Sequence, residues 1–373
     1  MTTSRRTSRK QQTAAAASGK AAGVMDYLRP LSEAVGISGR EDAVRTLVLD
    51  TIKGHVDSIR IDALGSVQAI KRGTDGANRP RVMIAAHMDE VGFMVTGVDN
   101  DGLVRFTVVG AIDDRILPGL RVRIGDDAIP GVILWTPIHR NNDQKVVKAK
   151  NLRIDIGASG KDGANGKVKK GDRIAFDTQY LEIGDRMLRG KSFDDRVGCS
   201  VLIDVLRGGP YAVDVLAAFT VQEEIGLRGA QVAAQTLQPD AAFVLEGTTA
   251  NDLPDPHADQ DRPLDINPTC RVGRGPVLSI MDRSMIVDPR LLRFLRGVAE
   301  DHYIPYQLKT MPGGATDGGI IHRSAGGAPT AVISMPVRYI HTPAALINRE
   351  DYQNDVALVK AALNALTWDA LRF

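Results

Sequence analysis

The amino-acid sequence predicts an α/β fold: a mostly parallel sheet, sandwiched between helices on both faces, that an inserted all-β module interrupts. Two observations favour this fold. Apolar runs typical of buried strands alternate with helical segments in residues 24–92 and again in residues 187–373. Between them, residues 93–186 consist of short alternating runs separated by turn sequences such as "DNDG", without a convincing long helix.

The first part of the α/β domain contains helices followed by strands. Residues 26–56 place apolar side chains at mixed three- and four-residue spacings, which indicates two helices broken around Gly36–Gly39. Residues 57–71 indicate a hairpin that turns at Leu64–Ser66. The continuous apolar run Val82–Ala86 is typical of a strand buried on both faces.

The second part repeats the alternation of helices and strands. One helix is predicted by the four-residue spacing of its valines and ends at Gly208–Gly209, and another begins at Pro289, because proline is favoured in a first turn. The valines are Val197, Val201 and Val205, and the predicted strands are Val213–Thr220, Ala241–Leu245, Ile304–Lys309 and Ala331–Met335. Such alternation predicts a mostly parallel sheet.

Composition excludes several classes of function. The 47 basic and 45 acidic residues leave a net charge of only +2, and aromatic residues make up 5% of the chain, so neither nucleic acid nor a membrane is an expected partner. Two cysteines, Cys199 and Cys270, cannot form a disulfide framework for 373 residues, which favours a reducing cytoplasm. Residues 1–23 form a basic segment without acidic residues, which we expect to be a disordered tail.

Polar residues follow the predicted strands where each strand ends. His87 and Asp89 follow the first buried strand, the doublet Glu223–Glu224 follows the second, and Glu246 and His341 follow the last two. Because sites in open α/β sheets lie at the carboxyl ends of strands, we expect these side chains to meet at one edge.

This collection of carboxylates and imidazoles suits two divalent transition ions, which would be zinc, cobalt or manganese. Asp194, at the start of the helix after the insertion, adds a carboxylate that could bridge two ions, although Asp194 or its neighbour Asp195 could instead cap that helix. Asp252 or Asp255 could compete with Glu246 for its role.

The adjacent glutamates Glu223 and Glu224 repel each other, so their proximity calls for an explanation. One glutamate of the pair, Glu224, could bind a metal ion while Glu223 acts as the general base on a metal-bound water. Neighbouring cations would reduce the repulsion.

Six motifs in order resemble those of the tetrahedral aminopeptidases, cocatalytic metallopeptidases also called cellulase-M-like. They are "AAHMDEVGFMV", "GKSFDDRVGC", "VQEEIGLRGA", "VLEGTTANDLP", "GGATDGGIIHRSAGGAPT" and "VRYIHTP". The resemblance covers residues 24–373 and has its insertion where that family carries a β-rich dimerisation domain. By this resemblance, residues 24–92 and 187–373 form the catalytic domain.

The resemblance also implies the roles of individual residues. Its ligand set is His87, Asp194 and Glu246 on one ion, and Asp194, Glu224 and His341 on the other. Glu223 is the base, and Asp89 orients the first histidine. Peptides are the implied substrates, hydrolysed from the amino terminus, and the implied assembly is a dodecamer built from dimers.

Two other functions compete with a metallo-aminopeptidase. A cellulase-like endoglucanase would use a pair of carboxylates without a metal, but then His87 and His341 would have no purpose. A self-assembling scaffold without catalysis would not need a complete ligand set and base.

Overall fold

The structure is a computed structural model, and it describes residues 27–137, 139, 145–253, 269–310 and 313–372. The predicted tail, residues 1–23, and Asp255 lie outside the described residues.

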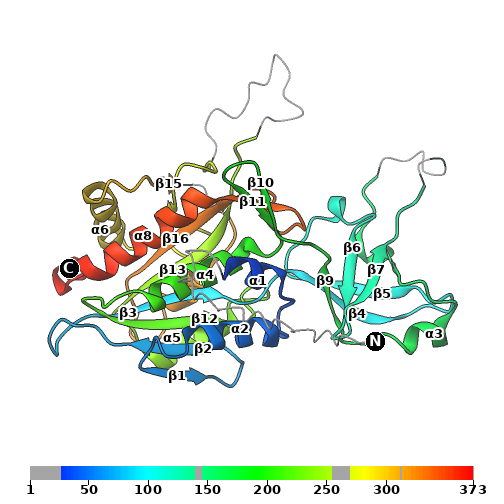
Figure 1. Cartoon of the computed structure of the whole chain (residues 1–373), viewed down its shortest axis with the longest axis horizontal. Coiled ribbons are helices and arrows are strands. Elements are labelled where there is room, and N and C mark those ends of the chain that lie inside the picture. Colours follow the sequence, from blue (N-terminus) through cyan, green and yellow to red (C-terminus); the bar gives the residue numbers. More distant parts are fainter. Residues whose placement is uncertain (1–26, 138, 140–144, 254–268, 311–312, 373) are drawn as a thin grey trace, which may run out of the picture.

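An eight-stranded sheet forms the centre of the larger domain (Figure 1). Its four middle strands are parallel, and antiparallel pairings join strands on both sides. The order across the sheet is β1 (Ser58–Ile61), β2 (Val67–Lys71), β12 (Asp214–Thr220), β3 (Arg81–His87), β13 (Ala241–Thr249), β16 (Thr330–Val337), β14 (Val277–Ser279) and β15 (Gln307–Lys309). The mostly parallel sheet is therefore confirmed, with antiparallel edges.

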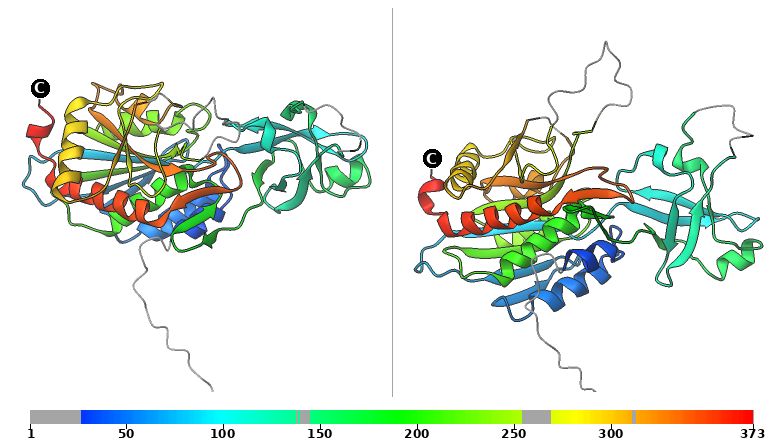
Figure 2. Two further views of the ribbon diagram at one scale, coloured as in Figure 1. Left: turned by 90° about the horizontal axis from the view of Figure 1, so that it is seen from above. Right: turned by 45° about the horizontal axis from the view of Figure 1, so that its top comes forward.

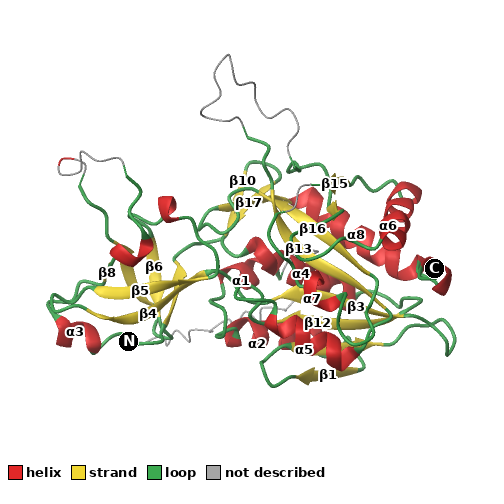
Figure 3. Ribbon diagram, turned by 180° about the vertical axis from the view of Figure 1, so that it is seen from behind, coloured by secondary structure: helices red, strands yellow, loops and turns green. Residues whose placement is uncertain are grey.

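Helices cover both faces of the sheet, as Figures 1 and 3 show from opposite sides. On one face α4 (Phe193–Arg207) packs on β3 and β13, and α1 (Leu28–Glu33), α2 (Asp42–Ile52) and α8 (Arg349–Ala365) pack around it. On the other face lie α5 (Arg228–Leu237) and α7 (Gly318–Ile321), while α6 (Pro289–Asp301) packs against α8 and β16. No described helix is both long and apolar enough to cross a bilayer.

The insertion forms a closed barrel with its own core, beside the sheet (Figure 2). Phe93 packs edge-to-face against Phe106 and Phe176 at its centre. The barrel order is β4 (Gly92–Val98), β5 (Val104–Val109), β8 (Ile154–Asp155), β7 (Ile129–Ile133), β6 (Arg121–Ile124) and β9 (Arg173–Phe176).

The insertion is not all-β, which corrects the prediction. A short helix, α3 (Lys161–Asn165), lies in its glycine-rich part, and two 3-10 turns, η1 (Asp114–Ile116) and η3 (Ala149–Asn151), connect its strands. Ala164 anchors this short helix in the barrel core, and Val168, just after the helix, is buried in the same core.

A small antiparallel sheet joins the barrel back to the larger domain. It consists of β10 (Leu181–Ile183), β11 (Met187–Gly190) and β17 (Ala345–Asn348), and Gly190 pairs with Ala345. Asp194 follows β11 and His341 precedes β17, so this pairing brings the two segments together. The chain ends after a 3-10 turn, η4 (Trp368–Ala370).

Candidate metal centre

The structure brings His87, Asp89, Asp194, Glu223, Glu224, Glu246 and His341 to the carboxyl edge of the four parallel strands, where such sheets place their sites. His87 ends β3, Glu246 lies within β13, and Asp194 lies in the first turn of α4. Loops after β12 and β16 carry the other candidates for ligands and base: Glu223, Glu224 and His341.

Asp194 lies between the two histidines. Its Oδ1 is 3.5 Å from His87 Nε2, and its Oδ2 is 3.0 Å from His341 Nε2. On the first side, His87 Nε2 is also 3.7 Å from Glu246 Oε2. On the second side, His341 Nε2 is 3.3 Å from Glu224 Oε1. One carboxylate therefore presents one oxygen to each histidine.

Both imidazoles are held by their other nitrogen. His87 Nδ1 is 3.1 Å from the backbone oxygen of Asp89, and His341 Nδ1 is 2.8 Å from that of Ala111. Because a carbonyl oxygen can only accept, these contacts place the proton of a neutral imidazole on Nδ1. Nε2 is then the free ligand atom on each ring, as in metal-bound histidines.

Asp89 supports the glutamate doublet as well as His87. Its carboxylate lies 3.4 Å from His87 Nδ1. The same carboxylate accepts hydrogen bonds from the backbone N–H groups of Glu223 (2.9 Å) and Glu224 (3.2 Å), and from Ser38 Oγ (2.6 Å). A buried carboxylate therefore connects β3 to the turn after β12.

Asp195 and Asp252 have other roles. Asp195 accepts hydrogen bonds from the backbone N–H groups of His87 (3.2 Å) and Gly198 (2.9 Å), so it caps α4, although it lies close to His87 and Glu246. Asp252 pairs with Arg338 through two contacts of 2.7 Å.

The cluster carries an excess of negative charge. Burial raises the pKa of Glu246 and of Glu223 well above the ordinary glutamate value. Burial would lower the pKa of His341, but hydrogen bonds to Asp194 and Glu224 outweigh it and raise that pKa to about 11. The pKa of His87 is likewise raised, against burial, by Asp194 and Asp89. The site therefore calls for positive charge, from protons or from cations.

The donor set fits divalent metal ions. Ligand atoms of two trios, His87–Asp194–Glu224 and His87–Asp195–Glu246, lie within 4.8 Å of one another. Glu246 Oε1 is buried without a hydrogen-bond partner among the described residues, and the buried Glu224 Oε1 faces His341 Nε2. Buried acceptors of this kind, together with imidazole nitrogens, are the ligands that zinc and similar ions take.

Two further residues at the site were not predicted from the sequence. Asp317, in the glycine-rich "GGATDGG", is buried and accepts a hydrogen bond from Thr220 Oγ1 at 2.6 Å, and burial raises its pKa to about 6. Lys309 lines the cleft beside the cluster. A single aspartate in a turn, or a lysine after a short strand, carries no pattern that distinguishes it from a surface residue.

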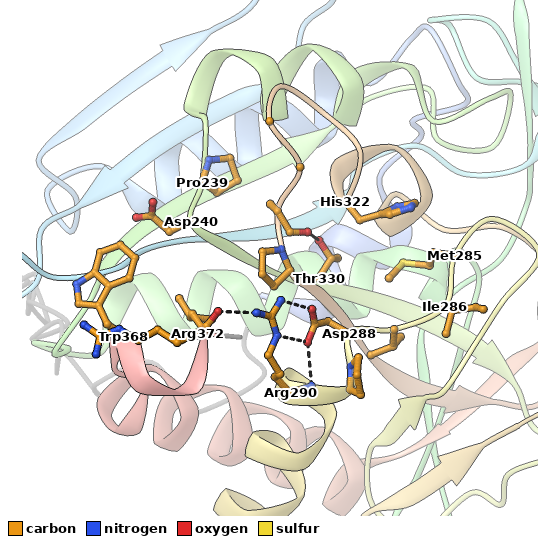
Figure 4. A pocket seen from close by; sticks show the side chains of 17 residues that line it. Pro239, Asp240, Met285, Ile286, Asp288, Arg290, His322, Thr330, Trp368 and Arg372 are labelled. Atoms are coloured by element: carbon orange, nitrogen blue, oxygen red, sulfur yellow. Dashed lines mark hydrogen bonds and ion pairs between the residues drawn. The ribbon is translucent and has the colours of Figure 1, made fainter.

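The cluster opens into a cleft of about 420 Å³. A larger pocket of about 800 Å³ lies at the opposite edge of the sheet, where β13 and β16 begin (Figure 4). There Arg290 pairs with Asp288 at 2.6 Å and donates to the backbone oxygen of Leu371. The larger pocket is thus separate from the metal centre.

An α/β domain that gathers two histidines and several carboxylates at one sheet edge is typical of metal-dependent hydrolases. The chain belongs to the M42 glutamyl aminopeptidase family, whose pattern matches residues 65–358. It is 31% identical to the lysyl aminopeptidase of Pyrococcus furiosus over 354 residues, which cover 91% of this chain and 97% of that protein.

Solved structures agree with this assignment. An aminopeptidase from the archaeon Desulfurococcus kamchatkensis has a TM-score of 0.87 and 35% identity, covering 94% of this chain and 96% of that one. The Pyrococcus horikoshii TET1 peptidase, described as able to assemble into a tetrahedron or a large octahedral shell, has a TM-score of 0.80 and 30% identity (92% and 100% covered). A Thermotoga maritima protein described as an endoglucanase has a TM-score of 0.74 and 35% identity (92% and 98% covered).

Proposed function

We propose that the protein is a dinuclear metal-dependent aminopeptidase. His87, Asp194 and Glu246 would hold one ion, and Asp194, Glu224 and His341 the other, with zinc or cobalt the best match to these ligands and manganese an alternative. The observation that supports this most is the position of Asp194, whose two oxygens face Nε2 of the two histidines at 3.5 and 3.0 Å.

Divalent ions at this centre would supply Lewis acidity, polarising a peptide carbonyl and lowering the pKa of water. Glu223 would be the general base: it would take a proton from the attacking water and pass it to the leaving amine. Its carboxylate lies 4.0 Å from His87 Nε2, and its backbone N–H is fixed by Asp89. Burial raises its pKa, which suits a group that must both accept and release a proton.

The acidic cluster would also attract the positively charged amino terminus of a peptide, which favours exopeptidase action. Among the relatives, one is named lysyl and another, from Lactococcus lactis, glutamyl aminopeptidase, so names alone do not decide the preferred terminal residue.

We further propose that the barrel mediates dimerisation and that dimers assemble into a dodecamer, in the cytoplasm. The barrel exposes large apolar side chains, with Trp135 62% and Val146 46% exposed, and such patches mark interfaces. A solution mass by light scattering tests the assembly. Both cysteines, Cys199 and Cys270, are free and buried, as a reducing compartment allows.

The decisive experiment is Glu223→Gln. We expect this variant to keep its metal content and oligomeric state while its turnover of aminoacyl-p-nitroanilides falls by roughly 10²–10⁴-fold, because only the proton acceptor is removed. Glu300→Gln, at an exposed position on α6, is the matched control. Near-normal turnover in Glu223→Gln would show that the base has been assigned wrongly.

A metal chelator separates this function from the glucanase alternative. A carboxylate-pair glycosidase works without a metal, so EDTA would spare it, whereas it should abolish aminopeptidase activity. A non-catalytic scaffold would show no turnover with zinc, cobalt or manganese added.

A further inference from the structure

Three buried charged side chains belong to the segments that carry His87 and Asp194. They are Glu90, Lys191 and Arg196; the first two are each 2% exposed and the third is 0% exposed. Glu90 follows His87 by three residues, whereas Lys191 and Arg196 lie on either side of Asp194 in the chain. None of the three is a proposed ligand or base, and none lines the cleft. Their burial beside the ligands therefore needs a separate explanation.

The Glu90 carboxylate joins the two segments. Its Oε1 and Oε2 accept hydrogen bonds from Lys191 Nζ at 2.7 and 2.8 Å. Oε1 also accepts a hydrogen bond from Arg196 Nη2 at 3.4 Å, and Oε2 accepts one from Ser192 Oγ. One carboxylate at the end of β3 therefore holds residues both before and after Asp194.

Arg196 links the same segments through backbone oxygens. Its Nε donates a hydrogen bond to the backbone oxygen of Met88, the residue after His87, at 2.8 Å. Arg196 Nη1 and Lys191 Nζ both donate to the backbone oxygen of Ala34, at 3.1 and 2.9 Å, so the loop after α1 belongs to the same network. Several hydrogen bonds thus fix the end of β3 relative to the start of α4.

Regular helix geometry does not fix the backbone at Asp194. Asp194 and Asp195 have non-helical φ and ψ angles of −90° and 104°, and of −121° and 42°. Ser192 has a φ of 58°, in the left-handed region that favours glycine. Residues in such conformations persist only where the surrounding structure holds them. The tip of the Asp194 side chain accepts a hydrogen bond from Gly247 N–H at 3.2 Å, and the Glu90 network holds the backbone on both sides.

The network is charged although it lies in the interior. Burial would raise the pKa of Glu90, but Lys191 and Arg196 outweigh it and lower that pKa. Burial lowers the pKa of Lys191 to about 8, against the attraction of Glu90. Buried ionic groups of this kind stabilise a fold no better than apolar side chains of similar volume. The geometry that the network imposes is therefore a better explanation for it than stability.

We propose that Glu90 is a positioning residue, which through its buried network holds Asp194 where one carboxylate can serve both metal ions. This inference rests on the proposed dinuclear centre. Because Asp194 would be shared, its displacement should weaken the binding of both ions together. Loss of a ligand to a single ion, such as His341, would instead weaken mainly that ion.

Glu90→Gln tests the proposal, because it removes the charge of this carboxylate at nearly constant volume. We expect the dissociation constants of both ions to rise roughly 10- to 100-fold, the usual cost of losing a residue that orients a metal ligand. Ser192→Ala removes one hydrogen bond from Glu90 and should have a smaller effect on both ions. Titration calorimetry of the chelator-treated proteins with zinc measures each constant. Unchanged constants in Glu90→Gln, or weaker binding of one ion alone, would overturn the positioning role.

A control variant separates positioning from a loss of stability. Tyr352→Phe removes a buried hydroxyl that donates to Asp204 Oδ2 at 2.6 Å and contacts Ser200 Oγ at 2.7 Å, further along α4. It should lower the unfolding temperature and leave both metal constants unchanged. An equal rise of the constants in Tyr352→Phe would show that metal binding merely follows stability, and would overturn the role of Glu90. If Glu90→Gln does not fold, Ser192→Ala carries the test, since it keeps all three charges.

A crystal structure of metal-free Glu90→Gln tests the same role without metal binding. We expect Asp194 Oδ1 to move away from His87 Nε2, beyond the 3.5 Å of the wild type. A displaced Asp194, in a protein whose wild type binds no divalent ions, would reject the dinuclear centre but support the positioning role. Two ions in the wild type, with Asp194 unmoved and both constants unchanged in Glu90→Gln, would reject the positioning role alone.

Discussion

His87 and His341 approach the same aspartate, Asp194, but two different regions of the molecule hold them. His87 ends a central strand, its side chain is 1% exposed, and its Nδ1 contacts Asp89 two residues along the chain. His341 lies in the loop after β16, its side chain is 27% exposed, and its backbone has a φ of 59°. Its Nδ1 contacts Ala111, which belongs to the inserted barrel.

This difference shows that the barrel is part of the site. The segment Gly110–Ala111 leaves β5 and reaches the cleft, where Ala111 orients His341. A second contact leads from the barrel to the doublet: Arg173 Nε donates to the backbone oxygen of Ser38 at 3.2 Å, and Ser38 Oγ donates to Asp89. The His87 side is thus built into the sheet, whereas the His341 side depends on packing between the two domains.

The strongest test of this comparison is to remove each histidine. Because each histidine would hold a different ion, we expect His87→Ala and His341→Ala each to lose about half of the bound metal. Activity should fall by orders of magnitude in both variants, because two ions act together. Metal content by mass spectrometry measures the loss. Loss of both ions, or of neither, in either variant would contradict the division into two sides.

Asp89 connects His87 to the glutamate doublet, Glu223 and Glu224, and the variant Asp89→Asn tests this connection. An amide would direct an NH₂ group toward the backbone N–H groups of Glu223 and Glu224, which now donate to the carboxylate. We expect kcat/KM to fall roughly 10- to 100-fold, as for other residues that orient metal ligands. Ser38→Ala removes one hydrogen bond from the same carboxylate and should have a smaller effect. A loss in Ser38→Ala as large as that in Asp89→Asn would show that the doublet is held elsewhere.

The sequence predicts the residues that follow strands of the large sheet better than it predicts the other residues of the site. The apolar runs before His87, Glu223 and Glu246 are clear, and parallel strands necessarily bring their carboxyl ends to one edge. The argument from strand ends also included His341, but the roles of Asp194 and His341 as ligands came from the resemblance to a family, and their approach depends on the short pairing of β11 with β17. Strands of four residues leave almost no periodic signal.

Helix α5 and the residue Lys309 were also not predicted, because their sequence signals are weak or not local. The buried face of α5 consists largely of small residues, including Ala230, Ala233 and Ala234, so its amphipathic pattern lacks the large apolar side chains that mark a helix most clearly. Lys309 was missed because its partner, Thr248, lies across the sheet on β13, and no local pattern encodes a contact between strands that are not neighbours.

The test with the smallest expected effect concerns the contact between the barrel and the His341 side. It uses two glycines of the inserted domain that share one backbone conformation. Gly110 and Gly119 both have φ of 82°, so alanine at either position should cost roughly 1–2 kcal/mol of unfolding free energy. At position 110 the added Cβ would lie 2.7 Å from Val91 Cγ1 and 3.3 Å from Glu224 Oε2, whereas at 119 it meets nothing within 4 Å.

Gly110→Ala should therefore also weaken metal binding on the His341 side, by up to about tenfold, because it displaces the segment that orients a ligand. Gly119→Ala should lose stability alone. Thermal unfolding measures the shared cost, and metal titration of the chelator-treated proteins measures the difference. If both variants bind metal as the wild type does, the barrel only packs beside the centre, and the His341 side is as independent of it as the His87 side.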